Sequence, residues 1–191
     1  MKTLLVYGTR YGATASTSAE IAKVLQSESF DVTVANAKEE KIKDISPFNL
    51  IIVGSGMQFG RWTGEAEDFI KRFQKELAQK KVAIFISTMK TVTEREGKTE
   101  ELAKTRKMEL EDKVTKYNLQ PISLGFFGGV LNFNKMNIIT RRTLGFLRTQ
   151  LEKDGFKESP SGVYELRDWE EIRGWTKELT VKARQYRLGF H

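Results

Sequence analysis

Short apolar runs, separated by polar segments with helical periodicity, organise most of this chain. The runs are rich in β-branched and aromatic residues, are bounded by turn residues, and occupy positions 3–7, 30–35, 50–53, 82–86 and 121–127. Most are continuously apolar rather than alternating, which is typical of strands that are buried on both faces of a parallel sheet.

Between these runs, apolar residues recur every three to four positions, as on the buried face of a helix. Such segments cover 19–25, 66–77, 102–114 and 168–183, and Asp168 is a candidate N-cap for the last one. Alternating strands and helices predict an α/β fold with a doubly wound parallel sheet, in which ligands bind beyond the carboxyl ends of the strands. Because no repeat, low-complexity tract or linker interrupts the pattern, we expect a single domain over residues 1–191.

The composition excludes several kinds of site and favours particular partners. The chain contains no cysteine, which excludes disulfides, thiolate catalysis and cysteine-ligated metal centres. The sequence begins directly with a predicted strand and has no apolar run of about 18 residues, so we expect a cytoplasmic protein, soluble or peripheral on the inner face of the cell membrane. The net charge of +7 favours an acidic redox protein, an anionic membrane or a carboxylated substrate as partner. The basic residues are dispersed without a reading motif, so we expect no nucleic acid partner.

The loop after the first predicted strand has the features of a phosphate site. It reads Thr9-Arg10-Tyr11-Gly12-Ala13-Thr14 and lies where a strand gives way to a helix. Free amides at a helix N-terminus, two threonine hydroxyls and a tightly turning glycine suit an anion. The loop lacks both the lysine of a Walker A motif and the three phased glycines of a dinucleotide fingerprint, which favours a mononucleotide. The alternative is an ordinary strand-to-helix turn.

Three later loops follow other predicted strands and should meet the first loop at one edge of the sheet. Two aromatic residues in the second loop, Phe59 and Trp62, would stack on a planar heterocycle, although the alternative is that both fold back onto the core. The further candidate cofactor-binding residues are Ser55, Gly56, Met57, Gln58 and Gly60 in that loop, Ser87, Thr88 and Met89 in the third, and Gly128 and Gly129 in the fourth.

The chain resembles the flavodoxin-like family over nearly its whole length. Two motifs carry the resemblance: Thr9-Arg10-x-Gly12-x-Thr14 after the first predicted strand, and the glycine- and aromatic-rich loop 54–64 after the third. The resemblance implies a three-layer sandwich with strand order 2-1-3-4-5 and one noncovalently bound FMN. It implies that the phosphate lies on residues 9–14 and that the isoalloxazine lies between residues 57–62 and the later loops, with Phe59 or Trp62 against a ring face. Arg10 is expected either to pair with the phosphate or to point to solvent.

A subgroup of that family, the menaquinone-dependent protoporphyrinogen IX dehydrogenases, is similar in three segments. These are the Thr-Arg start of the phosphate loop, the pattern Gly54-Ser55-x-x-x-Phe59-Gly60-x-Trp62, and the sequence VYELRDWE at 163–170. The resemblance implies oxidation of protoporphyrinogen IX to protoporphyrin IX in haem biosynthesis, with electrons passed through FMN to a quinone. The alternatives are an electron-transfer protein that shuttles between soluble redox partners, and a non-redox binding module with the same fold.

The segment 132–153 is longer than a simple crossover requires, and its pattern predicts an inserted basic amphipathic helix. Arg141, Arg142 and Arg148 are candidates for docking on an anionic membrane or on porphyrin propionates. The alternative is a helix that covers the sheet and leaves its basic face in solvent. The predicted apolar face consists of Met136, Ile139, Phe146, Leu147 and Leu151.

Other chemistry has little support in the residue types. The one histidine, His191, is the last residue, so we expect neither a hydrolase triad nor a metal site. A flavin enzyme needs few protein acid-base groups because the cofactor itself accepts the electrons. We therefore assign no catalytic side chain, and the sequence leaves the oligomeric state open.

Overall fold

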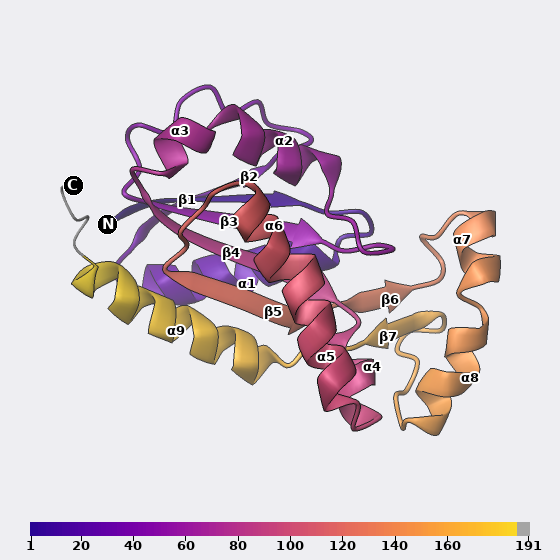
Figure 1. Ribbon diagram of the computed structural model, residues 1–191. Helices are drawn as coiled ribbons and strands as arrows, with labels where there is room; N and C mark the ends of the chain where they lie inside the picture. Colours follow the sequence, from indigo (N-terminus) through magenta and orange to yellow (C-terminus); the bar gives the residue numbers. More distant parts are fainter. Residues whose placement is uncertain (187–191) are drawn as a thin grey trace.

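A five-stranded parallel sheet forms the centre of the computed structural model, which describes residues 1–186 (Figure 1). The strand order is β2-β1-β3-β4-β5, which confirms the expected doubly wound topology. His191 lies outside the described residues. The strands are β1 (Lys2–Gly8), β2 (Asp31–Asn36), β3 (Leu50–Gly56), β4 (Lys81–Thr88) and β5 (Ser123–Gly128).

One face of the sheet is covered by α1 (Ala13–Ser27) and α9 (Trp169–Gln185). Leu5, Ile52 and Phe85 point from the strands into this layer and are completely buried. Helix α9 begins where Asp168 caps it, because the Asp168 carboxylate accepts from the amides of Glu170 (2.9 Å) and Glu171 (3.1 Å). The predicted N-cap is confirmed.

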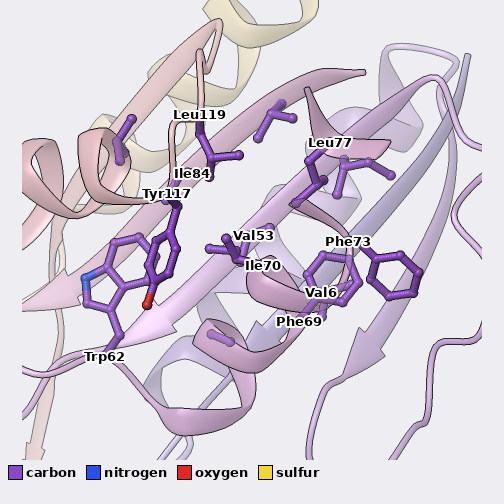
Figure 2. Packing of buried hydrophobic residues seen from close by; sticks show 14 of the residues in the cluster. Val6, Val53, Trp62, Phe69, Ile70, Phe73, Leu77, Ile84, Tyr117 and Leu119 are labelled. Atoms are coloured by element: carbon purple, nitrogen blue, oxygen red, sulfur yellow. The ribbon is translucent and has the colours of Figure 1, made fainter. Parts of the chain in front are cut away.

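The opposite face of the sheet carries α2 (Gly64–Arg72), α3 (Gln74–Leu77) and the helical run of α5 (Thr99–Arg106), η1 (Lys107–Glu111) and α6 (Asp112–Lys116). Figure 2 shows Phe69 of α2, and Phe73 between α2 and α3, in the apolar layer with the strand residues Val6 and Val53. Because the strands expose apolar side chains on both faces, two helical layers are needed to bury them. The result is the expected three-layer sandwich.

Helix α4 (Lys90–Arg95) follows β4 and is tied to α9 by a buried lysine. Lys90 Nζ lies 2.9 Å from a Glu94 carboxylate oxygen and 2.7 Å from one of Glu171. Burial opposes the charge of Lys90, but these two carboxylates outweigh it and raise the pKa of the amine. The ion pairs therefore fix the loop after β4 against the last helix.

The segment between β5 and α9 folds as a small satellite, here called the insert and defined as residues 130–165. Strands β6 (Val130–Asn132) and β7 (Val163–Glu165) pair antiparallel, and α7 (Ile138–Thr143) and α8 (Phe146–Lys153) complete it (Figure 1). The insert has its own apolar cluster, which includes Leu131, Phe133, Leu151 and Tyr164.

The prediction of one continuous amphipathic helix over 132–153 is wrong. The helix is interrupted at Leu144 and Gly145, and the first residues of the segment form a strand and a turn. The residues of the predicted apolar face therefore separate. Met136, in the turn before α7, and Leu151 of α8 are buried, whereas Ile139 of α7 and Phe146 at the start of α8 are exposed. Within residues 1–186, no helix combines the length and the hydropathy that a membrane span requires.

Candidate cofactor site

The loops after β1, β3, β4 and β5 meet at the carboxyl edge of the sheet and enclose a cavity of about 280 Å³. Most of the residues proposed from the sequence line it: Thr9, Arg10, Tyr11, Ala13, Thr14, Gly56, Met57, Gln58, Phe59, Gly60, Ser87, Thr88, Met89 and Gly129. The cavity wall does not include Gly12, Ser55, Trp62 or Gly128.

The first loop presents free backbone donors. The amides of Arg10, Tyr11, Ala13 and Thr14 donate no hydrogen bond within the part of the chain that the structure describes. Gly12 adopts a positive φ of 97° that a residue with a side chain rarely tolerates, and its amide donates to Thr9 Oγ1 at 3.0 Å. Free amides at the start of α1 are the groups that would hold a phosphate.

Arg10 is exposed and lines the cavity. Its guanidinium donates to the backbone oxygen of Trp62 at 3.0 Å, so it also joins the first loop to the second. The two loops are joined a second time, since Gln58 Nε2 donates to the Tyr11 hydroxyl at 3.2 Å. These contacts hold the cavity walls at a fixed separation.

The two aromatic residues of the second loop have different environments. Trp62 is only 3% exposed, packs beside Tyr117 in the core (Figure 2), and donates from Nε1 to the backbone oxygen of Glu109 at 2.7 Å. Phe59 is 66% exposed and lines the cavity. The fold-back alternative therefore describes Trp62, and Phe59 is the aromatic residue available to stack on a ring.

The local backbone explains the exposure of Phe59. Gln58 and Arg61 exchange two backbone hydrogen bonds of 3.1 Å, and between them Phe59 and Gly60 have φ values of 50° and 69°. This is a two-residue turn in which both central residues are left-handed, a conformation that glycine accepts and phenylalanine rarely adopts. The turn holds Phe59 at the rim of the cavity.

The third loop offers an unused hydroxyl. Ser87 is buried and lines the cavity, and its Oγ has no hydrogen-bond partner among the described residues. Buried hydroxyls are normally paired, so an orphan in a cavity wall fits a polar ligand. The neighbouring Thr88 hydroxyl is already used, because it donates to Phe127 O at 3.3 Å and accepts from the Lys90 amide at 3.0 Å.

Two of the proposed residues have structural roles instead. The Ser55 hydroxyl is buried and accepts from the Thr63 amide at 3.0 Å. A Cβ on Gly128 would lie 1.9 Å from the Leu166 carbonyl oxygen, so this glycine permits the close approach of the segment that leaves the insert. Neither residue reaches the cavity.

Sequence reasoning missed the outer wall of the cavity. That wall contains Val130, Leu131, Met136, Leu144 and Leu166 from the insert and its exit, and Lys90, Thr93, Thr105 and Glu109 from elsewhere. The Glu109 carboxylate makes no ion pair within residues 1–186, and burial raises its pKa above the ordinary glutamate range. No local motif identifies these residues, because long-range packing of the insert and of η1 brings them to the site.

The three candidate docking arginines also differ from one another. Arg141 donates to the backbone oxygens of Phe133 (2.9 Å) and Asn134 (3.4 Å). Arg148 lies over the Phe133 ring, 4.7 Å from its centroid, and 3.7 Å from a Glu158 carboxylate oxygen. Arg142 is exposed, and its side chain has no partner in the described structure. Two of the three therefore stabilise the insert itself.

A family model described as the flavodoxin domain matches residues 4–158. The chain therefore belongs to the flavodoxin-domain family, and this membership implies FMN as the cofactor and redox chemistry as its use. The free loop amides, the Phe59 ring and the orphan Ser87 hydroxyl fit the phosphate, the ring face and a polar edge of that cofactor.

One solved structure supports the fold, and two others are more distantly similar. A short-chain flavodoxin associated with a non-canonical PDU bacterial microcompartment is 14% identical, with a TM-score of 0.57 and coverage of 96% of this chain and 99% of that one. Flavodoxin 1 from Bacillus cereus is 14% identical, with a TM-score of 0.47 over 80% of this chain and 98% of its own. Megasphaera elsdenii flavodoxin is 19% identical, with a TM-score of 0.46 over 65% and 84% of the two chains. No curated protein sequence matches significantly.

Proposed function

We propose that this flavodoxin-domain protein oxidises protoporphyrinogen IX to protoporphyrin IX in haem biosynthesis and passes the electrons to a quinone. The observation that carries the proposal is the apolar wall that the insert adds to the cavity through Leu131, Met136 and Leu144. A protein that only exchanges electrons through an exposed ring edge needs no such wall. An enzyme that must hold an apolar macrocycle or an isoprenoid quinone against the ring does.

The side chains of this chain bind and orient rather than react. The free amides of Arg10, Tyr11, Ala13 and Thr14 would hold the phosphate together with the Thr9 hydroxyl. Phe59 would stack on the ring. The bound FMN supplies the capacity to accept a hydride or electrons, and the protein supplies position and electrostatics. Ser87 would donate to a polar edge of the ring, where its burial excludes competing water.

Arg142 is the residue that we assign to substrate carboxylates. It is exposed on α7, and α7 follows directly after Met136 of the cavity wall. A guanidinium without an intramolecular partner suits the propionates of a porphyrinogen better than Arg141 or Arg148, which already have partners.

The second candidate is electron transfer between soluble redox partners. It is favoured by the 66% exposure of Phe59 at the rim, because an accessible rim permits electron exchange with a docked protein. The net charge of +7 would steer an acidic partner toward this chain.

The test uses FMN-loaded protein under anaerobic conditions with protoporphyrinogen IX and a menaquinone analogue, followed by porphyrin fluorescence. Controls without protein, without quinone and with the Arg142→Gln variant accompany it. Growth of fluorescence that depends on quinone, with a raised KM in Arg142→Gln, supports the dehydrogenase. A flat trace from folded, flavin-loaded protein overturns it and favours the electron shuttle.

A further inference from the structure

The insert carries the most exposed large apolar side chains of the described structure. Ile138 is 83% exposed, Ile139 is 78% exposed and Phe146 is 69% exposed. The first two open α7, and the third opens α8. Figure 1 shows both helices at the end of the molecule, away from the central sheet and from both termini. We call these three residues the apolar tip.

The apolar tip does not belong to the packing of the insert. The inner sides of α7 and α8 are already used, since Thr140 and Leu151 are buried and Leu144 and Leu147 pack against the cluster of the insert. The tip residues therefore point away from that cluster. Single exposed apolar residues are common on protein surfaces, but three such large side chains on two successive short helices need a partner.

The charge around the apolar tip identifies the kind of partner. Residues 130–151 contain no aspartate or glutamate, and they carry Lys135, Arg141, Arg142 and Arg148. Arg148 is paired with Glu158, but Arg141 donates only to backbone oxygens and Arg142 is exposed without a partner in the described structure. Two guanidinium charges without a carboxylate partner therefore lie on α7, the helix that carries Ile138 and Ile139. A cationic surface around protruding isoleucine and phenylalanine side chains is complementary to an anionic lipid interface.

We propose that the apolar tip docks this protein on an anionic lipid bilayer, with Ile138, Ile139 and Phe146 in the boundary between headgroups and acyl chains. A stable protein interface buries about 1,200 Å² or more, which is more than three side chains supply. Three protruding apolar side chains can instead insert into a bilayer. The same insert forms the apolar wall of the cavity through Met136 and Leu144, so docking brings the cavity entrance to the lipid. The need for this placement rests on the proposed function, because only a lipid-dissolved acceptor requires the cavity to face the bilayer.

The direct test is co-sedimentation of the full FMN-loaded chain with vesicles of phosphatidylglycerol and phosphatidylcholine, and with vesicles of phosphatidylcholine alone. The test variant is Ile138→Ser/Ile139→Ser/Phe146→Ser, and the control is Met108→Ser/Val181→Ser, which removes exposed apolar residues outside the insert. We expect binding to the anionic vesicles, a loss of about tenfold or more in the triple variant, and no loss in the control. Arg142→Gln should weaken binding and reduce its salt dependence.

A depth measurement separates lipid insertion from surface attraction. In Phe146→Trp, lipids brominated in their acyl chains should quench fluorescence beyond the level of the parent protein. Absence of binding to anionic vesicles, or equal binding by the triple variant, overturns the proposal. Concentration-dependent self-association that the triple variant abolishes, without vesicle binding, overturns it in favour of a second copy of this chain. Vesicle binding without porphyrin formation supports the docking surface and overturns only the proposed reaction.

Discussion

Replacing Thr14 by glutamate tests the phosphate loop most directly. Thr14 is almost completely buried and lines the cavity at the first turn of α1, and its Oγ1 lies 3.0 Å from the position that a Cβ on Gly56 would take. A longer side chain at this position is therefore directed into the cavity. Two like charges about 4 Å apart repel by about 4 kcal/mol at an effective dielectric constant of about 20. A penalty of about 4 kcal/mol corresponds to FMN binding weakened about a thousandfold.

The assay is a titration of apoprotein with FMN, followed by quenching of flavin fluorescence. Thr14→Gln is the matched control because it has the same size without the charge, so the ratio of the two dissociation constants isolates the electrostatic part. Riboflavin, which has no phosphate, should bind both variants equally. Equal FMN affinity in the glutamate and glutamine variants, or an equal penalty for riboflavin, would refute a phosphate beside Thr14.

Three further predictions concern the two aromatic residues of the second loop and Glu109. Phe59→Ala should weaken FMN binding by about 0.5 to 1.5 kcal/mol, because it removes the ring that stacks on the flavin. Unfolding in urea should not change, because the Phe59 side chain is exposed. An unchanged FMN affinity would contradict stacking. Trp62→Phe should lower the free energy of unfolding by about 1 to 3 kcal/mol, because it leaves the Glu109 backbone oxygen without its donor. An equal loss of free energy in FMN binding would contradict a purely structural role for Trp62. Burial raises the pKa of Glu109 in the folded state. The ionised carboxylate therefore destabilises the folded protein at neutral pH, and this cost disappears below the ordinary glutamate pKa, where the carboxyl group is protonated in both the folded and the unfolded chain. Glu109→Gln should therefore be more stable than the parent at pH 7 and equal to it at pH 4, as measured by thermal melting; an advantage that persists at acid pH would contradict the assignment.

The sheet was predictable because its signal is local. Each parallel strand is buried on both faces and so appears as a continuous apolar run, and 50–53 and 82–86 fall within β3 and β4. The conformation of the loop at 9–14 was predictable for a similar reason, since a strand end, a glycine and a helix start are adjacent in sequence. Most loop residues proposed from these signals line the cavity.

The features that escaped prediction depend on contacts between distant residues. Trp62 is held in the core by the Glu109 carbonyl, 47 positions away, which no pattern around Trp62 indicates. Strands β6 and β7 have three residues each, too few to show a periodicity. A helical wheel assumes one helix, so it could not show that Met136 lies in a buried turn while Ile139, three positions later, is exposed on α7.

The chain enters and leaves the insert at neighbouring points. The Leu166 amide donates to Gly129 O at 3.0 Å, and the Thr91 hydroxyl donates to Leu166 O at 2.6 Å, so the base of the insert is closed by a few contacts. Most buried residues of its apolar cluster lie within the insert, and Val92 of α4 is added from outside. We therefore expect the length and surface of the insert to tolerate change more readily than the sheet or the loop at 9–14. Selection can thus retarget the protein to a new surface without rebuilding its redox centre.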